Sequence, residues 1–153
     1  WKDLSVGMMF QGVAGAERVL NGSSINPFNG GGGSGNLYSN IDDRWTEENP
    51  DQNAFYPRLS YGSETTSSIN NFQKSTWWVR NMNFLRLKTL QLSYNLPKPW
   101  VNKVHLKNAA VYVMGTNLFT LSRFKLWDPE LNTDNGASYP NTTSYSVGIN
   151  FTF

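Results

Sequence analysis

The final residues of the chain alternate strictly between large apolar and small or polar side chains. The polar positions are Ser146, Gly148, Asn150 and Thr152, and the apolar positions are Tyr145, Val147, Ile149, Phe151 and Phe153. A period of two residues is typical of a β-strand with one apolar face. The pattern predicts a strand over about residues 142–153. Its length fits the roughly 9 to 11 tilted residues that cross a bilayer as a strand.

Two upstream segments also carry strand patterns. Residues of about 109–120 are rich in Val, Tyr and Met, and both faces are apolar in the first half. A strand of that kind is covered on two sides. In the segment of about residues 3–20, apolar side chains occupy every second position from Leu4 to Phe10. The alternation becomes less regular from Gly12 onward. We expect a strand in each segment.

A further strand is predicted over about residues 77–96, where the apolar positions change parity between Leu87 and Leu90. A bulge near Lys88 and Thr89, or a change in which face is buried, accounts for the change of parity. Prolines directly after this segment end the strand, because they cannot donate a ladder hydrogen bond. The short connection that follows has room for one helical turn.

The other two connections are long. Residues of about 21–76 and 121–141 lack sustained periodicity and are rich in Asn, Pro and Gly, so they are predicted to be loops. Compact soluble domains seldom contain a structureless loop as long as the first of these. Outer-membrane barrels alternate short periplasmic turns with long extracellular loops. Four such strands also leave two unpaired edges, so we expect them to belong to a larger closed sheet.

Composition narrows the possible functions. The 153 residues suffice for one domain, and 13 basic against 11 acidic residues, with no basic block, give nucleic-acid binding little support. Cysteine is absent, and His105 is the single histidine. Cysteine zinc sites, thiolate nucleophiles and multi-histidine metal sites are thereby excluded within this chain. We expect no enzymatic activity and no cofactor.

Membrane-spanning helices are not expected, because no stretch reaches about 18 apolar residues. The mean hydropathy of −0.49 fits a soluble protein or a membrane β-barrel. The chain opens at Trp1, without an initiator methionine or a signal segment. We therefore expect it to be a piece of a longer protein.

Four strings in the second half of the chain together resemble the C-terminal end of SusC/RagA-like TonB-dependent outer-membrane transporters. They are Asn83–Pro97 (NFLRLKTLQLSYNLP), Val111–Phe119 (VYVMGTNLF), Trp127–Glu130 (WDPE) and the final Phe153. They occur in the correct order and finish on the terminal aromatic. Asp3–Gly15 is similar to an earlier strand of the family, less distinctively.

The resemblance implies a barrel of about 22 strands with an internal plug. This chain would hold the last four strands, with the plug absent from it and the two long loops extracellular. Such transporters import glycan oligomers or peptides through the outer membrane. The implied partners are the rest of the barrel and its plug, a SusD-like lipoprotein lid, the TonB system, the barrel-assembly machinery and outer-membrane lipid. The apolar row from Tyr145 to Phe153 would face lipid, and Phe153 would be an assembly signal, an interfacial anchor, or both.

Aromatic side chains in or beside the long loops are candidate substrate contacts, because their flat faces can stack on a sugar ring. The alternative is that they pack the loops together or against a lid protein, as the general composition of interfaces favours. The candidates are Trp45, Trp77, Trp78, Trp127 and Tyr139.

Acidic residues in the loops suggest no specific site. The carboxylates between Asp42 and Asp51 offer oxygen ligands of the kind calcium prefers, but their order does not fit an EF-hand, and a solvated loop explains them. Asp128 and Glu130 resemble a catalytic pair, yet the proline between them marks a turn. The Gly30–Gly33 run lacks the Lys-Ser/Thr of a phosphate loop. No catalytic residue and no metal site are predicted.

One alternative from another class remains open at this stage. The same strand pattern fits an extracellular β-sandwich module that binds carbohydrate through loop aromatics. The two hypotheses differ in what covers the apolar faces of the strands, which is lipid in a barrel and a second sheet of the same chain in a sandwich.

Overall fold

The computed structural model describes residues 3–22, 24–27, 38–59, 71 and 73–153. The predicted all-β class with antiparallel strands is confirmed. In chain order the elements are β1 Leu4–Val13, β2 Glu17–Val19, the 3₁₀ helix η2 Thr76–Trp78, β3 Val79–Asn81, β4 Phe84–Asn95, α2 Lys98–Lys103, β5 Asn108–Ser122 and β6 Ser144–Thr152. No helix among these residues is both long and apolar enough to cross a bilayer.

The chain divides into two compact units. The sheet unit comprises the described parts of Trp1–Ala16, Met82–Glu130 and Pro140–Phe153. The loop unit comprises the described parts of Glu17–Asn81 and Leu131–Tyr139. The two units contain separate sheets and separate cores, so each is described by itself.

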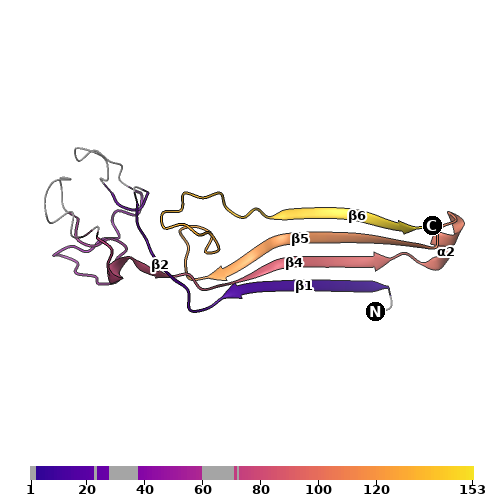
Figure 1. The fold of residues 1–153 in the computed structure, drawn as a ribbon, viewed down its shortest axis with the longest axis horizontal. Coiled ribbons are helices and arrows are strands. Elements are labelled where there is room, and N and C mark those ends of the chain that lie inside the picture. Colours follow the sequence, from indigo (N-terminus) through magenta and orange to yellow (C-terminus); the bar gives the residue numbers. More distant parts are fainter. Residues whose placement is uncertain (1–2, 23, 28–37, 60–70, 72) are drawn as a thin grey trace. The chain divides into compact units, whose positions relative to one another are not determined.

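Four antiparallel strands make up the sheet unit, in the order β1-β4-β5-β6 (Figure 1). Consecutive strands of this sheet are neighbours, as in an up-and-down meander. Within the described residues the outer edges of β1 and β6 pair with no further strand. An open sheet with two unpaired edges exposes backbone donors and acceptors that a complete barrel would pair.

A β-bulge interrupts the sheet at Lys88. It confirms the first of the two explanations given for the parity change in the sequence. Thr89 pairs with Met9 of β1 and Leu87 pairs with the next residue of that strand, so Lys88 is the extra residue. On the β5 side, two residues stand opposite Lys88, one of which is Asn117 with a left-handed φ of 51°. The bulge therefore restores the alternation of apolar residues on one face along the whole of β4.

The register places one row of apolar residues from each of the four strands on the same face. Val113 of β5 lies between Leu92 of β4 and Val147 of β6, and Val6 of β1 pairs with Leu92. This face is open: Tyr145 and Val147 are both 74% exposed. The opposite face carries mostly smaller or polar side chains, together with Tyr112 and Met114 of β5; the smaller or polar ones include Ser5, Gln91, Ser146, Asn150 and Thr152.

Helix α2 joins β4 to β5 at the end of the sheet that also holds the end of β6 (Figure 1). Pro97 precedes the helix, and Val101 is its buried residue. His105 then adopts a left-handed φ of 59°, and Leu106 N–H donates to the Val101 carbonyl. This is the bonding pattern with which a left-handed residue ends a helix. His105 is exposed.

The loop unit has a small aromatic core beside its two-stranded sheet of β2 and β3. Tyr56 and Trp78 are almost completely buried, with ring centroids 6.3 Å apart in an edge-on arrangement. Leu20 N–H donates to the Trp78 carbonyl, which ties the end of β2 to η2. An isolated bridge between Arg44 and Tyr56 orders the segment between them.

Two strand ranges differ from those expected. The range of about 3–20 contains β1 and the separate strand β2, and the range of about 77–96 begins in η2 and contains β3 before β4. The break lies where Met82 N–H donates to the Ala16 carbonyl and Asn83 Oδ1 accepts from Ala16 N–H. A side chain that accepts a backbone N–H replaces a ladder bond and ends the pairing there. The long sheet therefore begins at Phe84.

Candidate functional site

The structure places the adjacent residues Trp77 and Trp78 in different surroundings. Trp78 is 1% exposed, and its Nε1 donates to the Asn71 carbonyl at 2.9 Å. Its ring therefore packs the loop core and presents no face to a ligand in this structure. Trp77 is half-buried, and its Nε1 donates to the Phe55 carbonyl at 3.2 Å.

The other three aromatic candidates are also spread over the molecule. Trp45 is half-buried in the loop unit, where its backbone N–H donates to the Tyr56 carbonyl. Trp127, in the sheet unit, lies edge-on to Phe124 with ring centroids 4.9 Å apart. Tyr139 is 85% exposed. Of the five candidates, Trp77 alone lines the pocket described next.

The loop unit contains a pocket of about 320 Å³. Trp77 and Phe55 supply its aromatic surface, and the remaining lining residues are Asp43, Gln52, Asn53, Ala54, Thr76 and Arg80. Volumes of this order accommodate small molecules. The lining combines aromatic rings with several hydrogen-bonding groups, which suits a polar ligand that also has apolar ring faces.

Arg80 forms one wall of this pocket and is held by backbone carbonyls. Its Nη1 donates to the carbonyls of Trp77 at 2.5 Å and Val79 at 3.0 Å, and its Nη2 donates to Phe55 O at 3.3 Å. The guanidinium carbon also lies 5.3 Å from the centroid of the Phe55 ring. Burial lowers the pKa of Arg80, and the charge of Asp43 opposes that change. Arg80 therefore shapes the pocket and has little donor capacity left for a ligand.

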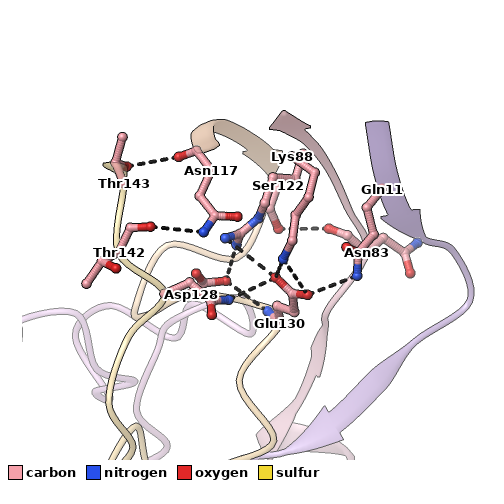
Figure 2. A network of polar contacts seen from close by, with 11 residues as sticks. Gln11, Asn83, Lys88, Asn117, Ser122, Asp128, Glu130, Thr142 and Thr143 are labelled. Atoms are coloured by element: carbon pink, nitrogen blue, oxygen red, sulfur yellow. Dashed lines mark hydrogen bonds and ion pairs between the residues drawn. The ribbon is translucent and has the colours of Figure 1, made fainter. Parts of the chain in front are cut away.

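The sheet unit contains a second polar cluster at the Lys88 bulge (Figure 2). Arg86 is 2% exposed and donates to Asp128, and its Nη1 lies 3.5 Å from Glu130 Oε2. Lys88 Nζ contacts both carboxylate oxygens of Glu130 at 3.2 Å. Two cations of β4 thus meet two carboxylates from the connection between β5 and β6.

Further hydrogen bonds extend this cluster across the sheet. Gln11 of β1 donates to Glu130 Oε1 at 2.9 Å, and Asn141 donates to Glu130 Oε2 at 2.8 Å. Asn117, in the bulge, donates to the Thr142 carbonyl at 2.9 Å. The loop that leads to β6 is therefore attached to β1, β4 and β5 (Figure 2).

The cluster keeps Asp128 ionised. Burial raises the pKa of Asp128, but hydrogen bonds from the Arg86 side chain and from the Glu130 N–H together lower it below its ordinary value. An acid catalyst would need a proton near neutral pH, and this carboxylate is stabilised without one. Asp128 and Glu130 therefore form structural ion pairs with Arg86 and Lys88.

The remaining sequence candidates do not assemble into a site. Among the described residues, no group of His, Asp and Glu side chains is arranged to hold a metal ion. Asp42 and Glu47 instead form exposed ion pairs with Arg44 and Arg58. The Gly30–Gly33 run lies outside the described residues.

Sequence reasoning did not find Arg80 or Arg86. Their partners lie in distant loops, and a single sequence does not record which arginine meets which carbonyl or carboxylate. The sequence contained one local signal for the Arg86 cluster, which is the parity change after Leu87. This change lies at the bulge, and at the bulge both Arg86 and Lys88 contact the acidic residues of the cluster.

An open apolar face, a more polar opposite face and antiparallel strands joined by a short and a long connection are features of a transmembrane β-barrel wall. Comparisons with known proteins agree. Two TonB-dependent receptors of Formosa agariphila, P26 and P3, match the whole chain at 34% and 28% identity. The chain spans 16% of the length of the first and 15% of the second. No protein-family model matches the chain.

Solved structures give the same result. The RagAB peptide importer in its closed-closed state matches all of this chain at 29% identity with a TM-score of 0.72, over 16% of the solved chain. Its open-open state matches at 28% identity with a TM-score of 0.69, again over 16% of that chain. The protein is a portion of a TonB-dependent β-barrel receptor. More narrowly, it belongs to the SusC/RagA-like outer-membrane transporters, as the C-terminal strings indicated.

Proposed function

We propose that this chain forms part of the membrane wall and outward loops of a TonB-dependent importer of glycan oligomers or peptides. The proposal rests on the family, and on relatives described as TonB-dependent receptors and as a peptide importer. The observation that carries it is the open apolar face of the sheet, because side chains such as Val147 would otherwise be left against water.

Lipid is the proposed neighbour of that face. Tyr145, Val147, Ile149, Phe151 and Phe153 are each more than half exposed and belong to one row. In the sandwich alternative this row would be sealed beneath a second sheet. Within the described residues the row has no such cover, which favours the barrel.

Topology follows from the same proposal. The loops of about 21–76 and 121–141 would face outward, and α2 and Phe153 would lie on the periplasmic side. A SusD-like lipoprotein would cover the outward loops as a lid. The TonB system would act through a plug outside this chain, and the barrel-assembly machinery would recognise the aromatic Phe153.

A charge placed on each face of β6 tests the membrane proposal. In the full-length transporter, Val147→Arg puts an arginine on the apolar face, at a cost of about 2–4 kcal/mol near the bilayer midplane. Ser146→Arg is the matched control, because it lies one residue away on the polar face. We expect Val147→Arg to reduce the amount of folded, heat-modifiable barrel in outer-membrane fractions. Ser146→Arg should leave that amount unchanged. Equal assembly of both would contradict a lipid-facing row.

Between the two substrate classes, the pocket favours a neutral glycan. Asp43, Gln52, Asn53 and Thr76 line it without a side-chain hydrogen bond to another described residue, so their donors and acceptors are available. The charges of Asp43 and Arg80 oppose each other, and Arg80 already donates to three carbonyls. A peptide carboxylate would find no free cation there, whereas sugar hydroxyls suit the amides.

Aromatic stacking completes the proposal. Trp77 is the proposed platform inside the pocket, and Trp45, Trp127 and Tyr139 are proposed secondary contacts along the outward loops. Trp78 contributes through the core that supports Trp77.

Uptake measurements separate the two substrates. We expect Trp77→Ala in the full-length transporter to reduce uptake of fluorescent neutral oligosaccharides by roughly tenfold, because it removes a large apolar ring surface and burial of such a side chain contributes about 1.5–3 kcal/mol. Trp77→Phe should retain part of the uptake. Tyr139→Ala, at a proposed secondary contact outside the pocket, should reduce uptake less than Trp77→Ala does. Uptake of peptides but not of oligosaccharides would overturn the glycan assignment and leave the importer proposal intact.

A further inference from the structure

Helix α2 and its flanks combine exposed apolar and basic side chains. Trp100 is 65% exposed and Val104 is 62% exposed, and their spacing of four residues puts them on one side of the turn. Val101 is buried, so it anchors the opposite side of the turn. Two large apolar groups are therefore held outward by the fold itself.

Basic residues surround these apolar groups. Lys98, Lys103 and Lys107 are exposed, and Lys98 Nζ donates to the Lys107 carbonyl at 2.8 Å. None of the three lysines forms an ion pair with a described carboxylate. The sequence contains no acidic residue between Leu96 and Ala109. The acidic residue described at this end of the sheet is Asp3, whose carbonyl accepts from Asn95 N–H.

The apolar face of the sheet continues to this end. Tyr94 is the last apolar-face residue of β4 before α2, and Phe151 lies opposite Ala109 at the start of β5. Both rings are about half exposed. Aromatic residues flanked by lysines at the end of an apolar face are typical of the level where lipid headgroups begin.

We propose that the α2 turn is a binding surface for anionic phospholipid, with Lys98, Lys103 and Lys107 on the phosphates and Trp100 and Val104 in the acyl boundary. This inference rests on the proposed membrane placement of the sheet. Charge complementarity selects an anionic headgroup, because lysines near a membrane surface are attracted to anionic lipids. The exposed Trp100 selects a lipid over a free phosphate ion, because inorganic phosphate offers nothing to an indole ring.

A protein partner fits less well. Stable protein interfaces bury upwards of about 1,000 Å². One six-residue helix with its flanks presents a smaller surface, and its basic residues border the apolar ones instead of forming a separate patch. Lipid molecules need no such area, since each binds through one headgroup and its chains.

The experiment uses the full-length transporter in nanodiscs of phosphatidylcholine, with and without phosphatidylglycerol. Native mass spectrometry measures the lipid retained, and the thermal midpoint is recorded in both nanodiscs. We expect the wild type to retain phosphatidylglycerol preferentially and to melt higher in its presence. The triple variant Lys98→Gln, Lys103→Gln and Lys107→Gln should bind this lipid roughly tenfold or more weakly. Arg123→Gln with Lys125→Gln, which removes two exposed cations elsewhere in the sheet unit, is the control and should behave as wild type.

Each outcome decides the proposal. Equal retention of both lipids by the wild type would overturn it even if the triple variant failed to assemble. Unchanged retention by an assembled triple variant would overturn it as well, and would leave the barrel proposal standing. Displacement of phosphatidylglycerol by polyglutamate, but not by inorganic phosphate, would assign the surface to an acidic protein instead. Failure of the wild type to enter nanodiscs would contradict the membrane placement itself.

Discussion

Arg86 of β4 donates a hydrogen bond to Asp128, which lies 42 residues further along the chain in the connection between β5 and β6. The arginine is almost completely buried, so Asp128 supplies the opposite charge that a buried cation needs. The pair joins the bulged strand to the loop that leads to β6. It therefore fixes the path of the connection between β5 and β6 against the sheet.

Removing the carboxylate of that pair should destabilise the protein. Asp128→Ala leaves Arg86 buried with only the longer 3.5 Å contact to Glu130, and breaking a buried pair costs about 3–5 kcal/mol. We expect a lower urea midpoint for the folded full-length transporter in lipid vesicles. Asp134→Ala breaks the more exposed pair with Arg18 and should cost at most about 1 kcal/mol. Similar losses in both variants would argue against a structural role for the buried pair.

The same pair predicts a response to acid. The pKa of Asp128 is lowered in the folded protein, because hydrogen bonds from Arg86 and Glu130 N–H outweigh the effect of burial. A carboxyl group with a lowered pKa in the folded protein stabilises the fold. This stabilisation is fully present above the unfolded pKa of about 3.9 and is lost as the pH falls through the folded pKa. We expect the contribution of Asp128 to the urea midpoint to be constant from about pH 7 to 5 and to decline progressively below about pH 4, as the pH approaches the lowered folded value. The measurement is the difference between wild type and Asp128→Asn across that range. A difference that vanishes already above pH 5 would contradict the assigned shift.

Two glycines on β1 provide a packing test. A Cβ at Gly12 would lie 2.7 Å from the backbone carbonyl oxygen of Phe84, whereas a Cβ at Gly7 would be 4.0 Å from its nearest neighbour, Gln91 Cβ. Backbone atoms of a paired strand cannot move aside cheaply, so Gly12→Ala should cost about 1–3 kcal/mol. Gly7→Ala should change the urea midpoint little. Tolerance of alanine at Gly12 would mean that β1 and β4 are further apart than described.

Substitutions of Trp127 distinguish a packing role of this side chain from direct contact with a ligand. Its Nε1 is buried and has no hydrogen-bond partner among the described residues, while its ring packs edge-on against Phe124. Trp127→Phe removes the unsatisfied donor and keeps a ring, so we expect unchanged or slightly higher stability, by up to about 1 kcal/mol. Trp127→Ala should destabilise the loop. If Trp127→Phe instead abolishes oligosaccharide uptake at normal stability, the indole contacts substrate directly.

Much of the sheet was predictable because its signal is local. In β6, every apolar residue falls on one face, and the parity change in β4 predicted either a bulge near Lys88 or a change of buried face, of which the structure shows the bulge. The short strands β2 and β3 were not separated from their longer neighbours. Each has three residues, too few for a period of two to be recognised, and the break between β3 and β4 depends on the Asn83 side chain.

The candidate site was less predictable for a related reason. Trp77 and Trp78 are identical in type and adjacent, yet one lines a pocket and the other fills a core. What distinguishes them is the arrangement of Phe55 and Tyr56, which come from a segment about twenty residues earlier. Loop composition reports that aromatic residues are present but not which of them stays accessible.

By itself the sequence determined the strand periodicity, the absence of cysteine chemistry and the family, since these depend on residue types and their order along the chain. Tertiary structure alone decided which charges meet, as with Arg86 and Asp128, and which side chains remain open, as with Trp77 and Trp100. The physical reason is the distance along the sequence over which each property is set. Alternation is set between neighbouring residues by the pleat of a strand, whereas burial and ion pairing are set by segments that meet only when the chain has folded.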